Sequence, residues 1–275
     1  MTHTWSNWSG SVTCMPQTIA MPTSEVEVIA LVKQASTDQA TVRVAGTGHS
    51  FTPLCVSNAV LVSLDGLQGL VRTTQEDATF WAGTKIHAIG DPLWEAGLAM
   101  ANMGDIDRQS LAGAISTGTH GTGPTLGSIS TQVMGLRLVI ASGEVIACSS
   151  TQEPEIFKAA QVALGALGII TQVTLRCLPA YRLHERTWVT PFDECMAQLD
   201  GSIAANRHFE FFWVPSEDVC AMKTLNPTLV DHLESPNRPR VTGRLTRYVR
   251  DEQIDRSYRI FPSERTLKFK DQSHA

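Results

Sequence analysis

Two glycine-rich stretches carry the residues that could do chemistry. The first reads Ala-Gly-Thr-Gly-His-Ser-Phe over 45–51, and the second reads Ser-Leu-Ala-Gly-Ala-Ile-Ser-Thr-Gly-Thr-His-Gly-Thr-Gly over 110–123. Glycine lets a backbone approach a ligand closely, and successive N–H groups with little side-chain cover form a concave anion site. Each stretch also supplies hydroxyls and one histidine, His49 or His120. Together they favour binding of a dinucleotide pyrophosphate over a pair of ordinary glycine turns between strands.

The best-known nucleotide motifs do not fit either stretch. Residues 46–48 match the first half of G-x-G-x-x-G, but Phe51 occupies the position of the third glycine. Gly113 and Gly118 have the spacing of a P-loop, but Thr119 occupies the position of its lysine. A Rossmann dinucleotide site and an ATPase or kinase site are therefore both disfavoured.

Regular elements must position the two stretches, and periodicity and end signals predict them. Ser24 and Glu27 have the spacing of a capping box at the start of the first helix. The predicted elements are helices over 25–36, 91–100 and 154–164 and strands over 41–45, 60–64, 79–82, 132–140, 144–148, 169–176 and 208–214. Asp91 is the expected N-cap of the second helix, with Pro92 at its first position. This alternation indicates α/β or α+β architecture, with a domain boundary near 180–185.

Composition limits the partners. The 275 residues are 43% hydrophobic and carry a formal net charge of −5, which argues against nucleic acid as the main partner. The basic run 238–250 is interpreted as a solvated face, with a phosphate or membrane patch as the alternative. The six cysteines are scattered without a C-x-x-C pair, which favours free thiols, and no metal site is predicted. Without a signal peptide or a membrane-length apolar run, we expect a cytoplasmic protein; composition leaves peripheral membrane attachment open.

Four segments together resemble a known family. They are 43–51, Ala-Gly-Thr at 82–84, 110–123, and Leu-Gly-Ala-Leu-Gly-Ile-Ile-Thr-Gln-Val-Thr-Leu at 164–175. In this order they resemble the vanillyl-alcohol oxidase superfamily of FAD proteins, and within it the sugar-lactone and polyol oxidases. The resemblance implies an α+β chain with a PCMH-type FAD-binding domain of two α/β subdomains over 1–182. The N-terminal part of an α+β substrate (cap) domain is expected over 183–275.

The resemblance also implies an FAD site with two walls. The diphosphate would be lined by Val44, Ala45, Gly46, Thr47, Gly48, His49 and Ser50. The second wall would be formed by Asp105, Ser110, Gly113, Thr117, Gly118, Thr119 and His120. Ile170, with Ile169 as the near alternative, would contact the cofactor through its backbone. His120 is expected to fix its loop and not to act in catalysis.

For His49 the resemblance implies a covalent bond to the 8α carbon of the isoalloxazine ring. A neutral imidazole is a competent nucleophile near physiological pH, so the bond is chemically reasonable. The alternative is a turn histidine hydrogen-bonded to its own backbone.

The implied reaction is oxidation of a CH–OH group of an aldono-1,4-lactone, of the D-arabinono or L-gulono type, or of an alditol. Hydride would pass to flavin N5, and O2 would reoxidise the flavin to give hydrogen peroxide. Asp105 stands where alditol oxidase is expected to have serine, which argues against polyol specificity. Gly104 matches a place where a small residue leaves a path for O2, which favours an oxidase over a dehydrogenase. No catalytic base is identified.

The sequence also departs from the family pattern. The His-Trp-Gly-Lys substrate motif does not occur in the 275 residues, although 255–261 resembles the middle of the substrate domain. We therefore expect a truncated member, with exposed sheet edges and a tendency to aggregate. Two alternatives remain: an FAD-binding module without turnover, and a MurB-type reductase that uses NADPH and holds FAD non-covalently.

Overall fold

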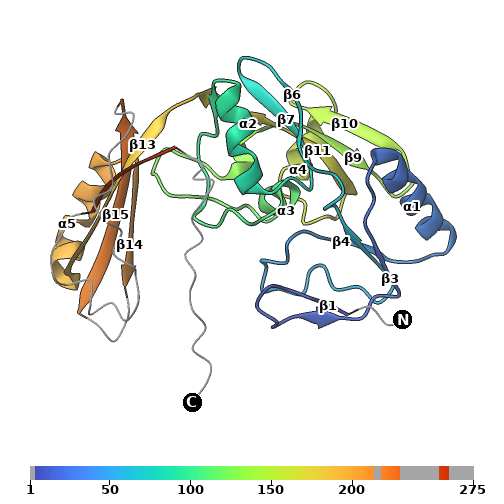
Figure 1. Ribbon diagram of the computed structural model, residues 1–275. Coiled ribbons are helices and arrows are strands. Elements are labelled where there is room, and N and C mark those ends of the chain that lie inside the picture. The colour runs from blue at the N-terminus through green and yellow to red at the C-terminus, as the bar shows by residue number, and fades with distance from the viewer. Residues whose placement is uncertain (1–3, 214–217, 230–253, 260–275) are drawn as a thin grey trace.

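The computed structural model describes residues 4–213 and 218–229, and the backbone of 254–259. In chain order the elements are β1 (Trp5–Ser6), β2 (Thr13–Cys14), β3 (Thr18–Ala20), α1 (Glu25–Thr37), β4 (Val42–Ala45), β5 (Val60–Ser63), β6 (Leu70–Thr73), β7 (Asp77–Trp81), η1 (Ile86–Ala88), α2 (Gly90–Glu95), β8 (Leu98–Ala99), α3 (Leu111–Ser116), η2 (Ile129–Gln132), β9 (Val133–Val139), β10 (Val145–Ser149), α4 (Pro154–Ala160), β11 (Ile169–Arg176), β12 (Leu178–Pro179), β13 (Arg182–Pro191), α5 (Phe192–Ala205), β14 (His208–Trp213), β15 (Val219–Thr228) and β16 (Ile254–Arg259). Figure 1 shows β13, β14, β15 and α5 standing to one side of the remaining elements.

The first layer is a parallel sheet in the order β3-β5-β4, joined through α1. The helix begins where the capping box predicts, because the Ser24 hydroxyl accepts a hydrogen bond from the Glu27 N–H at 3.2 Å. The Glu27 carboxylate reaches back one residue further than expected and accepts from the Thr23 N–H at 2.8 Å. Val28 and Val32 lie on the buried side of α1, as their spacing predicts.

The second layer is an antiparallel sheet in the order β10-β9-β11-β7-β6. The predicted hairpin at 141–143 is confirmed, since β9 and β10 pair from Val139 opposite Val145. Helix α1 is fixed to this sheet by Glu25, which bonds Arg137 on β9 and Thr171 on β11, each at 2.6 Å. The Arg137 hydrogen bond holds the pKa of the Glu25 carboxyl below its usual value. One hydrophobic core therefore spans both layers.

Two predicted helices are shorter than expected. The second begins at Gly90 with Ile89, not Asp91, as its N-cap, and it ends at Glu95 because Gly97 takes a positive φ of 71° and redirects the chain into β8. The third ends at Ala160, not Leu164. The turn that follows contains three positive-φ residues, Leu164 at 53°, Gly165 at 79° and Gly168 at 145°, and leads into β11.

A further sheet begins at β13, with the antiparallel order β14-β15-β13-β16. Helix α5 covers one of its faces, where Cys195 of the helix is buried with Cys220 and Met222 of β15. Trp188 and Phe211, which flank Met222 on the neighbouring strands, pack against the same cluster. We call this four-stranded unit with α5 the cap sheet.

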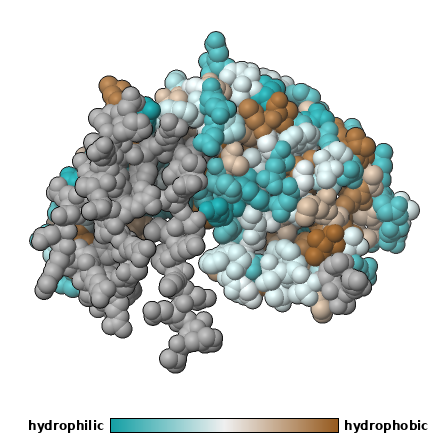
Figure 2. All heavy atoms as spheres, in the orientation of Figure 1, coloured by the Kyte–Doolittle hydropathy of each residue, from teal (hydrophilic) through white to brown (hydrophobic). Residues whose placement is uncertain are grey.

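The surface mixes polar and apolar residues. On the face drawn in Figure 2, brown hydrophobic residues form separate patches among teal and white ones. None of the helices in the described ranges combines the length and apolar character that a membrane-spanning segment requires.

Candidate functional site

The two glycine-rich stretches meet in the folded chain. Gly46 follows β4, and a Cβ atom added to it would lie 2.4 Å from the Ser110 hydroxyl oxygen and 4.0 Å from the Gly113 Cα. Any side chain at position 46 would therefore fill the space between the stretches. Residues 64 positions apart in sequence thus form two sides of one narrow gap, as the dinucleotide interpretation requires.

Polar groups at this gap lack partners within the described ranges. The N–H groups of Thr47, Gly48, His49 and Ser50 donate to no described backbone or side-chain acceptor. Ser110 is only 5% exposed, and its hydroxyl makes no hydrogen bond to a described residue. Unpaired amides and a hydroxyl around a gap kept open by glycine suit the oxygens of a pyrophosphate.

A third segment, Ala82 to Thr84, holds the second stretch in place. The Leu111 N–H donates to the Thr84 carbonyl at 2.8 Å, and the Ala112 N–H donates to the Ala82 carbonyl at 3.0 Å. The Ala82 N–H in turn donates to the Thr171 carbonyl of β11 at 2.9 Å. The start of α3 is thereby fixed to the five-stranded sheet.

A groove of about 300 Å³ continues from β4. Its walls come from Val42 and Val44 of β4, from the end of α1, and from the turn 164–169 that precedes β11. Ile169 lines the groove, whereas Ile170 does not, so the structure places the near alternative at this surface. The volume of the groove lies at the lower end of the range of small-molecule sites.

His49 lies under an N-terminal hairpin that sequence reasoning missed. The Trp8 N–H donates to the Gly48 carbonyl at 3.1 Å, and the Asn7 amide donates to the Ser50 carbonyl at 3.1 Å. The Trp8 ring lies 5.7 Å from the His49 ring, centroid to centroid. Trp5 also closes on the turn, since a Cβ on Gly48 would lie 3.3 Å from its ring. The N-terminal aromatic residues were the only sequence signal for this contact.

The two histidines of the glycine-rich stretches differ in their bonding. His120 Nδ1 lies 2.8 Å from the Gly121 carbonyl oxygen, which ties the side chain to its own loop. The His49 ring nitrogens have no hydrogen-bond partner among the residues that the structure describes, so the turn-bonded alternative is not what the structure shows for His49. Partial burial lowers the pKa of His49, which favours its neutral, nucleophilic form.

The rest of the second stretch forms a tight loop. The Thr117 hydroxyl donates to the Gly113 carbonyl at 3.0 Å, and Thr119 accepts from the Gln109 side chain at 3.1 Å. Gly118 has a positive φ of 67°. A Cβ on Gly104 would lie 2.9 Å from the His120 carbonyl oxygen, so the 102–105 loop packs closely on this wall.

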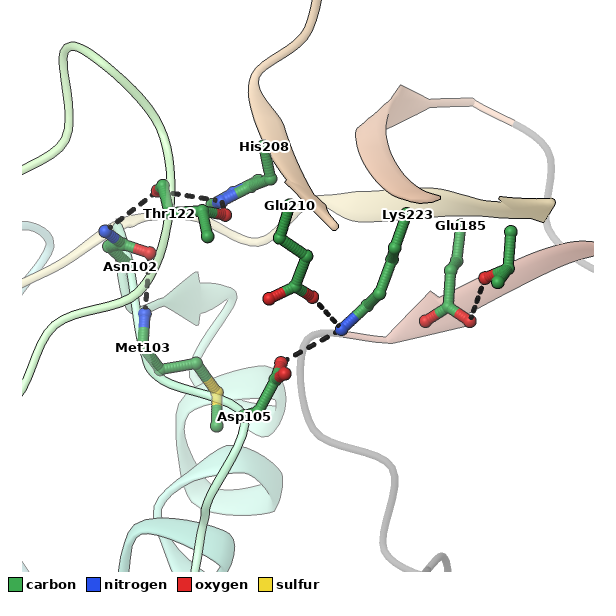
Figure 3. Close-up of polar contacts among 9 residues, drawn as sticks. Asn102, Met103, Asp105, Thr122, Glu185, His208, Glu210 and Lys223 are labelled. Atoms are coloured by element: carbon green, nitrogen blue, oxygen red, sulfur yellow. Dashed lines mark hydrogen bonds and ion pairs between the residues drawn. The ribbon is translucent and has the colours of Figure 1, made fainter. Parts of the chain in front are cut away.

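Asp105 extends from that loop to the cap sheet (Figure 3). Its carboxylate accepts a hydrogen bond from the Lys223 ammonium at 2.9 Å, and Glu210 forms an ion pair with the same ammonium at 2.6 Å. Nearby, His208 Nδ1 lies 3.1 Å from the Thr122 carbonyl oxygen. Burial, followed by the charge of Arg207, lowers the pKa of His208, so its ring is favoured in the neutral form. No sequence pattern pointed to these cap-sheet residues.

Gly46→Ala should weaken FAD binding by at least about tenfold, because the new methyl group collides with the Ser110 hydroxyl. The backbone at Gly46 needs no positive φ, so the fold should be retained. The Kd for FAD should be measured by flavin fluorescence for Gly46→Ala, Ser110→Ala and the double variant, each in the His49→Ala background so that binding is reversible. Ser110→Ala should partly relieve the defect, giving a non-additive cycle. Strict additivity would show that the two walls do not meet at these atoms.

Comparisons with known proteins agree with this geometry. The family model described as "FAD binding domain" matches residues 16–149, and the model described as "D-arabinono-1,4-lactone oxidase" matches 173–267. An L-gulono-1,4-lactone dehydrogenase of Mycobacterium tuberculosis is 33% identical over all of this chain and 71% of its own length. A D-arabinono-1,4-lactone oxidase of Yarrowia lipolytica is 36% identical over 80% of this chain and 43% of its length. An L-gulonolactone oxidase of Scyliorhinus torazame is 32% identical over 79% and 50%.

Solved structures show the same fold. A solvent-stable cholesterol oxidase superposes with a TM-score of 0.74 and 22% identity, covering 86% of this chain and 49% of its own. Cholesterol oxidase from B. sterolicum superposes with a TM-score of 0.72 over 82% and 48%. The fold is thus the α+β, PCMH-type FAD-binding fold, continued by a second α+β unit. The chain belongs to the family of FAD-dependent sugar-lactone oxidoreductases, and it spans from 43% to 71% of the length of the relatives named above.

Proposed function

We propose that this protein is an FAD-dependent oxidoreductase that oxidises a CH–OH group of an aldono-1,4-lactone. The observation that carries the proposal is the meeting of Gly46 with Ser110 beside four backbone amides that have no partner among the described residues. Family membership supplies the substrate class, since the matched relatives are named for D-arabinono- and L-gulono-lactones. An alditol is the neighbouring substrate class to be tested.

The proposed cofactor site uses both walls. The diphosphate would lie between the first wall, Val44 to Ser50, and the second wall, which consists of Asp105, Ser110, Gly113 and Thr117 to His120. The adenine end would lie in the groove beside Ile169, with Ile170 behind it in β11. When bound, FAD would supply the two-electron acceptor for the alcohol. The protein's own contribution is to hold it and to orient the lactone.

We further propose that His49 holds the flavin covalently, through one ring nitrogen and the 8α carbon. Forming this bond removes the imidazole N–H proton and one 8α proton, and leaves two electrons on the flavin for an acceptor such as O2. The lowered pKa of His49 and the absence of a competing hydrogen bond among described residues support this role. The N-terminal hairpin restrains the turn that carries the ring.

The proposed boundary between the FAD-binding domain and the substrate domain lies where the chain enters a new sheet at β13. Residues 1–182 would form the FAD-binding domain, and 183–275 would belong to the substrate domain. O2 is the proposed electron acceptor, on the family resemblance at Gly104. In the structure the absence of a side chain at Gly104 lets its loop pack against the His120 carbonyl.

The experiment is anaerobic reduction of the FAD-loaded chain. Addition of D-arabinono-1,4-lactone or L-gulono-1,4-lactone should bleach the flavin absorbance near its 450 nm band, and NADPH should not. Readmission of O2 should restore the absorbance and yield one hydrogen peroxide per flavin. Bleaching by NADPH alone would indicate a reductase, and FAD binding without bleaching by lactone or alditol would indicate a binding module. Restoration by a dye but not by O2 would indicate a dehydrogenase.

A further inference from the structure

The cap sheet has one face that α5 does not cover. The registers place Glu210, Lys223 and Thr187 directly opposite one another on β14, β15 and β13. His208 and Glu185 occupy the next such row, because side chains two residues apart share a face of a strand. We call the surface formed by these two rows the polar face. Figure 3 shows Lys223 between Glu210 and Asp105 of the 102–105 loop, and His208 directed toward Thr122, with Glu185 to one side.

A lysine with two carboxylate partners forms the centre of the polar face. The Lys223 side chain is 18% exposed and Glu210 is 19% exposed, whereas the Asp105 side chain is 54% exposed. The two carboxylates raise the pKa of Lys223 and outweigh the opposing effect of burial, so the ammonium stays charged. The three groups together carry a net charge of −1, and they open to solvent on the Asp105 side.

Each member of this cluster keeps unused hydrogen-bonding capacity in the described part of the chain. An ammonium has three N–H donors, and Lys223 uses two of them, for Asp105 and Glu210. The second oxygen of each carboxylate accepts no described hydrogen bond. On the same face, the buried His208 Nε2 has no partner among the described residues. A buried polar atom without a partner calls for a ligand or an ordered water.

The geometry points to a hydroxyl-binding subsite for a neutral, polyhydroxylated ligand, formed by Asp105, Lys223 and Glu210. A sugar hydroxyl both donates and accepts, so one ligand hydroxyl can bond the free ammonium hydrogen and a free carboxylate oxygen together. The cluster shares Asp105 with the proposed second wall, and His208 beside it contacts Thr122. The inference rests on the proposed function, of which it specifies the substrate-binding residues.

The charge of the cluster predicts which ligands it accepts. A lactone ring is neutral, but its hydrolysed form is a carboxylate. A net charge of −1 beside a half-buried subsite repels that carboxylate, and desolvation strengthens the repulsion. We therefore expect the lactone to bind at least about tenfold more tightly than the matching aldonate.

The test is ligand binding to the FAD-loaded full chain, photoreduced so that no turnover occurs. L-gulono-1,4-lactone, D-arabinono-1,4-lactone, xylitol and L-gulonate are titrated into wild type, Lys223→Met, Lys223→Arg, Asp105→Asn and Glu210→Gln. Lys223→Met should raise the Kd for the best neutral ligand about 10- to 100-fold, because a charged hydrogen-bond donor is lost. Lys223→Arg should stay within about fivefold of wild type. Glu210→Gln should narrow the preference for lactone over gulonate.

Arg72→Met is the control, because Arg72 also pairs with a carboxylate, Asp77, but on β6, outside the polar face. It should leave every Kd unchanged. Flavin content and melting temperature are measured for each variant. If Lys223→Met loses structure, the near-isosteric Glu210→Gln decides the test, because Glu210 pairs with Lys223 and lies in neither wall of the proposed FAD site. It should weaken neutral-ligand binding with the flavin content unchanged.

Three results would overturn the inference: no binding of lactone or xylitol to wild type, unchanged Kd values in Lys223→Met, Asp105→Asn and Glu210→Gln, or a preference for gulonate. The binding test on reduced flavin judges the subsite, and bleaching of the oxidised flavin by the lactone judges the proposed function. The two failures can therefore be told apart. Bleaching with Kd values insensitive to the cluster would keep the function and reject the subsite. Cluster-dependent binding without bleaching would keep the subsite and reject the oxidoreductase.

Discussion

His49→Ala is expected to abolish acid-stable flavin. The wild-type chain, loaded with FAD and precipitated with acid, should keep yellow flavin in the pellet, and peptide mass should place it on the peptide containing His49. In His49→Ala all flavin should appear in the supernatant. Of the histidines in the two stretches, His120 is bonded to its own loop, whereas the His49 ring has no hydrogen-bond partner among the described residues. Burial also lowers the pKa of His49. A neutral ring with a free lone pair is the form that attacks carbon.

Two further variants test whether the loss of acid-stable flavin is specific to His49. His120→Ala should retain acid-stable flavin, because the His120 ring is committed to the Gly121 carbonyl. His87→Ala should behave as wild type, since His87 is exposed and lies outside both glycine-rich stretches, with its ring Nδ1 3.2 Å from the Asp107 carbonyl oxygen. Release of flavin from the wild-type chain would contradict covalent attachment, and acid-stable flavin in His49→Ala would move the bond to another residue.

Gly83→Ala is expected to destabilise the fold by on the order of 3 kcal/mol or more. A Cβ at this position would lie 1.8 Å from the Leu64 carbonyl oxygen and 2.8 Å from the Leu67 carbonyl oxygen. Both are backbone atoms, so no side-chain rotation relieves the collision. The same segment holds the start of α3, which means that FAD binding should fall together with stability.

Gly201→Ala is the matched control. Gly201 lies inside α5, where an added Cβ meets nothing within 4 Å, so the substitution should be neutral or stabilising by up to about 1 kcal/mol. Urea unfolding of both variants, followed by tryptophan fluorescence, gives the free energies of unfolding. A Gly83→Ala variant within about 1 kcal/mol of wild type would show that the 64–67 loop can move away.

Much of the fold was predictable because local signals and tertiary contacts agree. Strand 169–176 was predicted to the residue, since its β-branched run occupies the centre of a buried sheet. Helix 91–100 was predicted too long because Gly97 adopts positive φ, which periodicity does not reveal. Helix 154–164 was also predicted too long, since it ends at Ala160. The domain limits at 182 and 183 and the roles of the site residues remain predictions.

The sequence by itself determined the chemistry that this protein is built to support: the glycines at 46, 48, 113 and 118, their hydroxyl neighbours, and the order of four family segments. Those signals are local, since consecutive residues specify a glycine-rich turn whose N–H groups are left available to a ligand. Only the tertiary structure decided that Gly46 faces Ser110, that Trp8 covers His49, and that Lys223 joins Asp105 to Glu210. Such contacts join residues far apart in the chain, and they depend on which faces of the sheets are buried, which no short window of sequence specifies.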